Sequence, residues 1–313
     1  MPEAVLKVGI VGTGMVGMSC AYALQQSGIA HEIVLVDVDQ ERALGEAMDL
    51  NHGMPFVNPC RISAGGYAAL QDAAAVVVSA GANQKPGETR LDLLQRNAGI
   101  IRDVVRQIVQ AAPDTTIILA TNPVDILTYI AATAVQLPPG RILGSGTILD
   151  TARLRYLLAD YYRVDARSVH AYIIGEHGDS SVPVWSLANI GGMRLAGLTR
   201  AGPYNQQALN DLFLQARDAA YEIIKRKHAT YYAIGLALVT IVEAVIRNQQ
   251  TVLTVSTPLQ GQYGVTGMAL SLPSIVGRRG VEEVLTLHLS DEETHQFQHS
   301  AELLRERYQH VAS

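Results

Sequence analysis

The stretch LKVGIVGTGMVG at residues 6–17 decides the fold of the first half of this chain. A short apolar run ends in a glycine-rich turn, and a helical stretch to about Ser27 follows. In the pattern G-x-G-x-x-G, the first glycine allows a tight turn, the second lets a phosphate approach the backbone N–H groups at the helix start, and the third allows the helix to pack closely on the strand. The pattern predicts a dinucleotide-binding turn formed by Gly12, Gly14, Met15, Val16 and Gly17.

Asp37 ends the next apolar run, residues 33–37, and lies twenty residues after Gly17. At this place in dinucleotide-binding folds, a carboxylate accepts hydrogen bonds from the two hydroxyls of the adenosine ribose. It would repel a ribose 2′-phosphate, and Val38 and Asp39 add no basic residue to receive one. Glycines in such a turn can be purely steric, but together with Asp37 they predict a site that binds NAD rather than NADP.

Short apolar runs alternate with helical stretches through the first half of the chain. Further runs lie at residues 73–81, 115–121 and 141–146, and they are nearly continuously apolar, as strands buried on both faces are. This alternation predicts a doubly wound parallel sheet. We therefore expect an α/β chain in which residues 1–146 form a Rossmann-type NAD-binding domain.

The second half, residues 147–313, has a different pattern that predicts an α+β catalytic domain. A helix is expected to end at Tyr162, and the apolar segment SVHAYIIG at residues 168–175 is expected to form one strand. The remaining expected elements are helices at 205–227, 230–247 and 291–311, and antiparallel strands at 251–259 and 264–277. No linker separates the halves, so we expect them to pack tightly.

Composition and charge exclude several functional classes. The 24 basic and 29 acidic residues form no long run of either sign, which argues against binding to nucleic acid or to an anionic membrane. The longest apolar stretch, residues 233–246, is too short for a bilayer and contains Glu243. Two cysteines favour a cytoplasmic protein without a structural metal. A charged fraction of 17% is below the roughly 25% usual for soluble domains, which indicates an oligomer with apolar surface buried between subunits.

The segment GTILDTARLRYLL, residues 146–158, carries three charged residues near the start of an expected helix. At about 100° per residue, Asp150 and Arg153 lie about 60° apart on one face, whereas Arg155 lies about 200° from Arg153. The two arginines are therefore expected to serve different sites. Taken alone, Asp150 and Arg153 could be an ordinary surface ion pair.

His177 makes a catalytic interpretation stronger. It stands in GEHGDS, residues 175–180, between two glycines and directly after an apolar strand, where ligand sites of open sheets form. A carboxylate such as Asp150 could fix the tautomer of His177 and stabilise its cation, as a general acid–base pair requires. The other eight histidines lack this context.

The segment GANQKPGETR, residues 81–90, follows the carboxyl end of another expected parallel strand. Its glycines and charged tip predict a lid that closes over the substrate, expels water and delivers Arg90. An ordinary mobile surface loop would have a similar sequence.

These motifs together resemble the L-lactate dehydrogenase branch of the lactate/malate dehydrogenase family. The likeness covers essentially the whole chain and rests on GTGMVG, GANQKPGETR, TNPVDILTY, GSGTILDTARLR, IIGEHGDSSVPVW and KRKHATYYAIGLAL. It implies reversible, NADH-dependent reduction of pyruvate to L-lactate, in a homotetramer and without a metal.

The resemblance also implies a role for each site residue. His177 would be the proton donor and acceptor, with Asp150 as its partner. Arg153 would bind the substrate carboxylate bidentately, and Arg90 would polarise the reacting carbonyl. The other implied site residues are Gln84 facing the substrate side chain, Asn122 orienting the nicotinamide and the reacting hydroxyl, and Thr230 lining the pocket.

Two alternative functions remain open at this point. The chain could be a malate dehydrogenase or act on another 2-hydroxy acid, and Gln84 bears on this because malate dehydrogenases carry an arginine there for a second carboxylate. It could also be a non-catalytic dinucleotide sensor, although a sensor does not need His177, Asp150, Arg153 and Arg90 together.

An allosteric site is a further expectation from the resemblance. Many bacterial members have an arginine and a histidine at the positions of Arg155 and His170, and they bind fructose 1,6-bisphosphate across a two-fold subunit interface. Animal members keep similar residues without this activation, so the two residues could equally be ordinary interface or surface residues.

Overall fold

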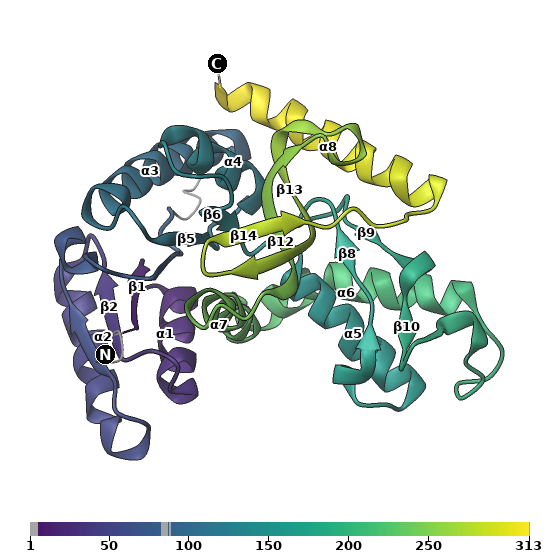
Figure 1. Ribbon diagram of the computed structural model, residues 1–313, viewed down its shortest axis with the longest axis horizontal. Coiled ribbons are helices and arrows are strands. Elements are labelled where there is room, and N and C mark those ends of the chain that lie inside the picture. Colours follow the sequence, from purple (N-terminus) through teal and green to yellow (C-terminus); the bar gives the residue numbers. More distant parts are fainter. Residues whose placement is uncertain (1–5, 83–86, 88, 313) are drawn as a thin grey trace.

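The computed structural model describes residues 6–82, 87 and 89–312, and a nine-stranded sheet forms its centre (Figure 1). The strand order is β14-β13-β12-β6-β5-β4-β1-β2-β3. Six strands pair in parallel: β1 (Lys7–Val11), β2 (Glu32–Val36), β3 (Arg61–Ala64), β4 (Ala75–Val78), β5 (Thr116–Leu119) and β6 (Ile142–Gly144). The predicted doubly wound parallel sheet is confirmed, and β3 is a strand that the sequence analysis did not specify.

Helices cover both faces of this sheet. Alternate residues of β4 show the two layers, because Ala75 and Val77 pack in one apolar cluster and Val76 and Val78 in another. The first cluster includes residues of α1 (Met15–Ser27), α2 (Gln40–His52) and α7 (Tyr232–Ile246). The second includes residues of α3 (Arg90–Ala111) and α4 (Val124–Ala134). Burial of both faces explains why the strand sequences are continuously apolar.

Three antiparallel strands extend the same sheet, namely β12 (Thr251–Gln260), β13 (Thr266–Gly277) and β14 (Gly280–Val284). The connection is made where Ser256 of β12 lies opposite Gly144 of β6. A Cβ atom on Gly144 would lie 2.3 Å from Thr128 Oγ1, so only glycine fits between α4 and the sheet there. The expected antiparallel strands are confirmed, but they belong to the central sheet, which therefore runs through both halves of the chain.

The second half adds its own layer of helices and short strands. The helices are α5 (Ile148–Tyr162), α6 (Gln206–Lys227) and α8 (Asp291–Ala312). The strands are β7 (Val169–His170), β8 (Ile173–Ile174), β9 (Val182–Pro183), β10 (Asn189–Ile190) and β11 (Met193–Arg194). Single 3₁₀ turns occur at Met54–Phe56, Tyr67–Leu70, Ala166–Ser168, Trp185–Leu187, Leu195–Gly197 and Gln262–Gly264.

The prediction of one strand over residues 168–175 is wrong. β7 pairs with β10 in a three-stranded sheet, whereas β8 pairs with β9 in a separate two-stranded sheet. Side chains of α5 bond the backbone at this break: Arg155 Nε donates to Ala171 O at 3.0 Å, and the N–H of Ile173, the first residue of β8, donates to Thr151 Oγ1 at 3.0 Å. These tertiary contacts replace the ladder bonds of a continuous strand.

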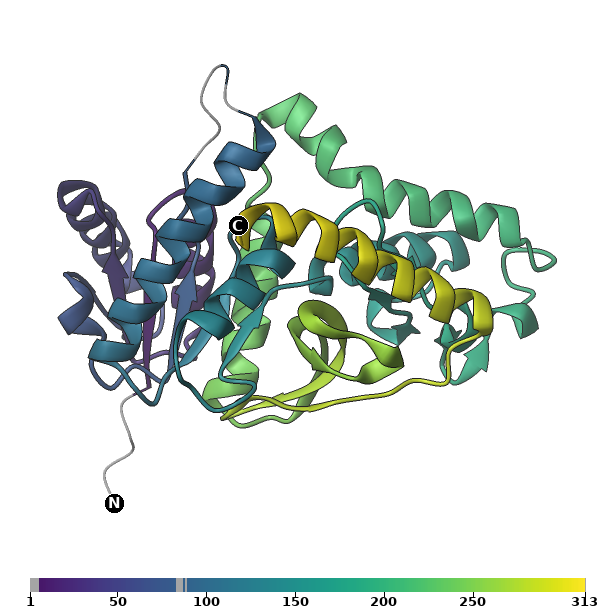
Figure 2. The same cartoon turned by 90° about the horizontal axis from the view of Figure 1, so that it is seen from above.

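The last helix, α8, runs back from the second half towards α3 and α4 (Figures 1 and 2). Phe297 is fully buried in the apolar cluster that also contains residues of α3 and α4. Gln95 Nε2 of α3 donates to His310 O at 3.2 Å. This course places the side chains of α8 beside the segment that follows β8. Within the described residues, no helix is long and apolar enough to cross a membrane.

Candidate active site

The turn between β1 and α1 has the geometry that the glycine pattern predicts. Gly12 adopts φ +102°, and a Cβ atom there would lie 2.6 Å from Ala80 N. A Cβ atom on Gly17 would lie 1.9 Å from Gly12 O. By contrast, a Cβ atom on Gly14 would meet no described atom within 4 Å. Gly12 and Gly17 are thus required by the packing of the chain, and the space beside Gly14 is free for a bound group.

The N-terminus of α1 suits an anion. Gly14 is its N-cap, no side chain caps it within the described part of the chain, and its first turn has no acidic residue. The first backbone N–H groups of a helix have no partner within the helix, and the helix dipole favours negative charge there. The side chain of Met15 is 61% exposed beside them, and Val16 is half-buried. These groups fit the pyrophosphate of a dinucleotide.

Asp37, directly after β2, is held in place by the same turn. Its Oδ2 accepts Thr13 N–H at 2.6 Å and the Thr13 hydroxyl at 3.0 Å, and its Oδ1 accepts Asp39 N–H at 3.0 Å. Burial opposes ionisation of this carboxyl, but the hydrogen bonds outweigh it and hold its pKa below the usual value. Arg42 was not among the expected site residues; its charge also lowers this pKa, and its Nε lies 3.8 Å from Glu46 Oε1.

His177 and Asp150 meet as predicted. His177 follows β8, and Asp150 lies in the first turn of α5. His177 Nδ1–H donates to Asp150 Oδ2 at 2.5 Å, and Arg153 Nη1 donates to Asp150 Oδ1 at 3.0 Å. The side chain of Asp150 is 8% exposed, whereas that of His177 is 25% exposed. The carboxylate therefore holds one ring nitrogen inside the protein, while part of the imidazole remains accessible.

The electrostatics of this cluster favour a protonated histidine. Burial disfavours the imidazolium of His177, but the charge and hydrogen bond of Asp150 outweigh it, so the pKa of His177 is raised above its usual value. Burial likewise disfavours the Asp150 carboxylate, and His177 and Arg153 outweigh it and lower the pKa of Asp150. The arrangement therefore favours a proton on His177, which a general acid could release to a substrate.

Two further carboxylates next to His177 were missed by the sequence analysis. The backbone N–H of His177 donates to Asp125 Oδ2 of α4 at 2.7 Å. Glu176 is buried, pairs with Arg307 of α8 and accepts a hydrogen bond from the Ser180 hydroxyl. Both acidic residues stand in the quoted motifs TNPVD and GEHGDS, so the signal was present, but local spacing does not reveal partners on distant helices.

The other predicted substrate residues are described to different extents. Asn122 is exposed after the carboxyl end of β5, and Thr230 is half-buried between α6 and α7. Arg90 is the first residue of α3, where Thr89 forms a capping box with Asp92. The lid prediction falls largely on residues 83–86 and 88, so Gln84, like the side chain of Arg90, lies outside the described residues.

Arg155 and Arg153 serve different places, as the helical spacing predicts. Arg153 contacts Asp150, whereas Arg155 bonds Ala171 O, and its guanidinium lies 5.3 Å from the centre of the Tyr172 ring. His170 is exposed on β7, one residue before Ala171. Arg155 thus bonds the backbone of the residue that follows His170.

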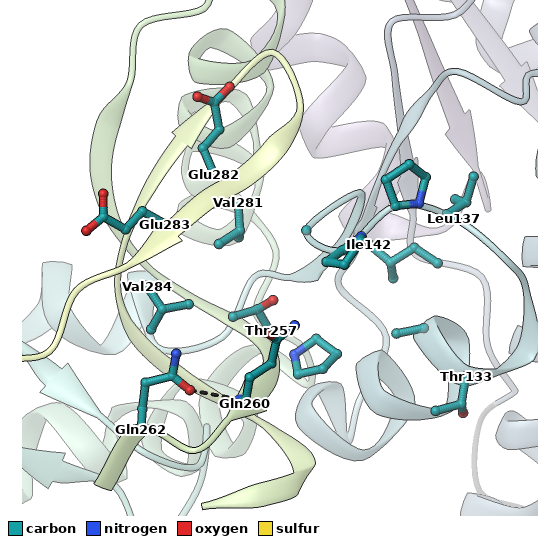
Figure 3. Close-up of a pocket in the computed structure, with 15 residues that line it drawn as sticks. Thr133, Leu137, Ile142, Thr257, Gln260, Gln262, Val281, Glu282, Glu283 and Val284 are labelled. Carbon is teal, nitrogen blue, oxygen red and sulfur yellow. Dashed lines mark hydrogen bonds between the residues drawn. The ribbon is translucent and has the colours of Figure 1, made fainter.

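A cavity is present elsewhere in the fold, and Figure 3 shows it in close-up. It has a volume of about 390 Å³ and lies between the end of α4, residues 137–142, β12 and β14. Its labelled side chains include Thr133, Glu282 and Glu283. None of the predicted site residues lines it, so it is not the site assembled around His177. Among the described residues, no group of three or more His, Cys, Asp or Glu side chains could hold a metal ion.

Two family profiles together match nearly the whole chain. The sequence profile of the lactate/malate dehydrogenase NAD-binding domain matches residues 6–144, and that of the lactate/malate dehydrogenase alpha/beta C-terminal domain matches residues 147–313. An L-lactate dehydrogenase of Priestia megaterium is 49% identical over 301 residues, which are 96% of this chain and 95% of the relative. An L-lactate dehydrogenase of Acetivibrio thermocellus is 47% identical over 306 residues, which are 97% of this chain and 96% of the relative.

Solved structures agree with these relatives. A lactate dehydrogenase from a deep-sea metagenome library of the Medee basin superposes with a TM-score of 0.95 at 44% identity, covering 98% of this chain and 99% of that one. The minor L-lactate dehydrogenase of Enterococcus mundtii, in a ligand-bound form, also has a TM-score of 0.95, at 43% identity and 99% coverage of both chains.

Proposed function

The chain belongs to the lactate/malate dehydrogenase family and has the NAD-dependent activity of an L-lactate dehydrogenase, and on this premise we propose which of its residues carry the reaction. His177 is the proton donor in pyruvate reduction and the acceptor in lactate oxidation. Asp150 fixes its tautomer and stabilises its cation. Arg153 binds the substrate carboxylate. The observation that carries this proposal is the chain of contacts from Arg153 through Asp150 to His177.

Each nitrogen of His177 has a distinct task in this proposal. Because Asp150 holds Nδ1–H, Nε2 is the atom that exchanges a proton with the substrate oxygen. The raised pKa keeps this proton in place until the oxygen becomes negative. The carboxylate takes only one of the five N–H donors of Arg153, which leaves donors for a bidentate bond to the carboxylate of pyruvate.

The cofactor end of the site is proposed from the β1–α1 turn. When bound, reduced NAD supplies the hydride that is added to the keto carbon. Gly12, Gly14, Met15, Val16 and Gly17 would surround its pyrophosphate, Asp37 would accept hydrogen bonds from the adenosine ribose, and Asn122 would orient the nicotinamide end. The free space beside Gly14 and the uncapped helix support this arrangement. From the family resemblance, we further propose that Arg90 polarises the carbonyl, and that Gln84 and Thr230 line the substrate pocket.

His177→Asn tests the central assignment, because asparagine keeps hydrogen-bonding capacity and loses the titrating proton. We expect kcat for pyruvate reduction to fall by about 10²–10⁴-fold, the usual contribution of general acid catalysis. NADH binding, followed by fluorescence titration, should stay unchanged. A variant that keeps a tenth of the wild-type kcat would refute the assignment.

We also propose a homotetramer. Several large apolar side chains are exposed around an open hollow beside α1 and α7, among them Met15 (61%), Tyr22 (58%), Tyr232 (69%) and Leu236 (63%). Exposed apolar surface of this kind is typical of a subunit interface. Sedimentation of the purified chain would test this, since a monomer at micromolar concentration would contradict it.

Three smaller proposals complete the functional assignment. The chain divides into an NAD-binding domain, 1–146, and a catalytic domain, 147–313. Fructose 1,6-bisphosphate binds at Arg155 and His170, which is supported by the hydrogen bond from Arg155 Nε to the O atom of Ala171, the residue after His170. The protein is cytoplasmic, where reducing conditions keep the buried thiols of Cys20 and Cys60 free.

A further inference from the structure

Thr13, in the turn between β1 and α1, is a polar residue to which the proposed function assigns no role. It is fully buried. Its hydroxyl donates to Asp37 Oδ2 at 3.0 Å, and its backbone N–H donates to the same oxygen at 2.6 Å. One residue thus directs two hydrogen-bond donors at one oxygen of the carboxylate that is proposed to bind the adenosine ribose.

These bonds connect the glycine-rich turn to the end of β2. Gly12 N–H also donates to Val36 O at 2.8 Å, so residues 12–13 are hydrogen-bonded to residues 36–37 through both backbone and side chain. β1 and β2 are adjacent parallel strands, and the two segments lie at their carboxyl ends. The proposed pyrophosphate site and the proposed ribose carboxylate therefore form one connected unit.

The bonds from Thr13 also decide which oxygen of Asp37 remains available. A carboxylate oxygen has about two lone pairs, and the two donors of Thr13 occupy those of Oδ2. Among the hydrogen bonds of the described residues, Oδ1 accepts only Asp39 N–H, at 3.0 Å. Oδ1 therefore keeps acceptor capacity for a ribose hydroxyl. Because Asp37 is only half-buried, hydrogen bonds rather than packing must hold its carboxylate in this orientation.

We propose that the Thr13 hydroxyl is a positioning group for cofactor selection, which holds the Asp37 carboxylate where Oδ1 accepts a ribose hydroxyl and where its charge repels a ribose 2′-phosphate. This inference rests on the proposed binding of NAD at Asp37. A hydroxyl with a purely structural role would stabilise the turn without affecting the choice between NAD and NADP. Selectivity between the two cofactors therefore distinguishes the proposal from a structural role.

Thr13→Val tests the proposal, because valine has nearly the shape of threonine and keeps the backbone N–H but lacks the hydroxyl. We expect the Kd of NADH, measured by fluorescence titration without substrate, to rise by about 3- to 10-fold. This is less than the full contribution of a hydrogen bond to a charged group, because the N–H of residue 13 still holds Oδ2. The Kd of NADPH should not rise, because a less restrained carboxylate can turn away from the 2′-phosphate.

Two results of this titration would overturn the proposal. An unchanged Kd for NADH would show that the hydroxyl does not position the carboxylate. An equal rise for NADH and NADPH would show that the whole turn is distorted, since both cofactors share the pyrophosphate. Thr13→Ser, which keeps the hydroxyl, should retain the selectivity for NADH, and a serine variant as weak as the valine variant would also contradict the proposal.

Thr116→Val is the matched control. Thr116 is likewise fully buried, and its Oγ1 lies 3.4 Å from Arg141 Nη1. It is the first residue of β5, so it lies at the opposite edge of the sheet from the glycine-rich turn. The Kd of NADH should match the wild type in this variant. A rise equal to that of Thr13→Val would overturn the proposal, because the loss of any buried hydroxyl would then be sufficient.

Thr13→Ala carries the same expectation if the valine variant does not fold, because alanine removes the hydroxyl without adding bulk to the turn. Asp37→Ala separates this inference from the proposed function. If Asp37→Ala leaves the Kd of NADH unchanged, the proposed cofactor site is wrong. If it weakens NADH binding while the Thr13 variants do not, only the role of Thr13 fails. In the Asp37→Ala background, Thr13→Val should have no further effect on the Kd of NADH, and an undiminished effect there would overturn the proposal.

Discussion

Replacing Asp150 by asparagine should disable the site almost without changing its shape. The carboxylate accepts His177 Nδ1–H with one oxygen and Arg153 Nη1 with the other. Asparagine has one oxygen and one NH₂ group, so its oxygen can accept one of these two N–H donors. The other N–H donor then faces the NH₂ group, which is itself a donor. Either the ring of His177 or the guanidinium of Arg153 then loses its partner.

The expected loss follows from the burial of this pair. Asp150 is 6% exposed, and removing one partner of a buried charged pair costs about 3–5 kcal/mol. When this cost is added to the activation free energy of pyruvate reduction, kcat/KM falls by about 10²–10⁴-fold. NADH binding should not change, because no contact joins Asp150 to the β1–α1 turn among the hydrogen bonds of the described residues.

The loss should also depend on pH in a defined direction. Asp150 raises the pKa of His177 against the effect of burial, so the pKa of His177 falls when the carboxylate is lost. Pyruvate reduction needs the protonated form, which the variant retains only at low pH. The ratio of wild-type to variant kcat/KM should therefore be larger near pH 8 than near pH 6.

The assay is NADH oxidation with pyruvate across this pH range, with Asp160→Asn as the control on an exposed site of the same helix. The control should behave as the wild type. A ratio that is constant with pH, or an Asp150→Asn variant with more than a tenth of the wild-type kcat/KM near pH 8, would refute the reasoning.

Three other predictions concern specificity, stability and regulation. Gln84→Arg should move the preference towards oxaloacetate, whose second carboxylate otherwise loses water without gaining a partner, and a wild type that already prefers oxaloacetate in kcat/KM would contradict this. Arg307→Gln should lower the free energy of unfolding in urea by about 1–3 kcal/mol, because it leaves the buried carboxylate of Glu176 without its ion-pair partner, although Arg307 itself is half-exposed. In the double variant with Glu176→Gln, the two losses of stability should not add, and simple additivity would show that the pair is not coupled. Millimolar fructose 1,6-bisphosphate should lower the KM for pyruvate, because a ligand that binds the active arrangement more tightly stabilises it, and superimposable saturation curves with and without the ligand would rule out the Arg155 and His170 site.

Much of the site follows from local sequence rules. The glycine pattern predicts the β1–α1 turn because tight packing against Ala80 and Gly12 O excludes any side chain there. Helical spacing puts Asp150 and Arg153 together and sends Arg155 elsewhere, as the hydrogen bonds confirm. The pairing of His177 with Asp150 was predicted as a chemical requirement, and the structure supplies the 2.5 Å contact.

By itself, then, the sequence determined the alternation of strands and helices and the dinucleotide turn, because each depends on backbone periodicity or on residues within a short segment. It indicated His177 and Asp150 as partners through their chemistry. Only the tertiary structure decided that residues 168–175 break into two strands and that β12 joins the parallel sheet at Gly144. It also decided that Asp125 and Arg307 reach the loop of His177 across 52 and 131 residues of chain. Such contacts depend on which faces of distant helices pack together, and that packing has no local periodicity to reveal it.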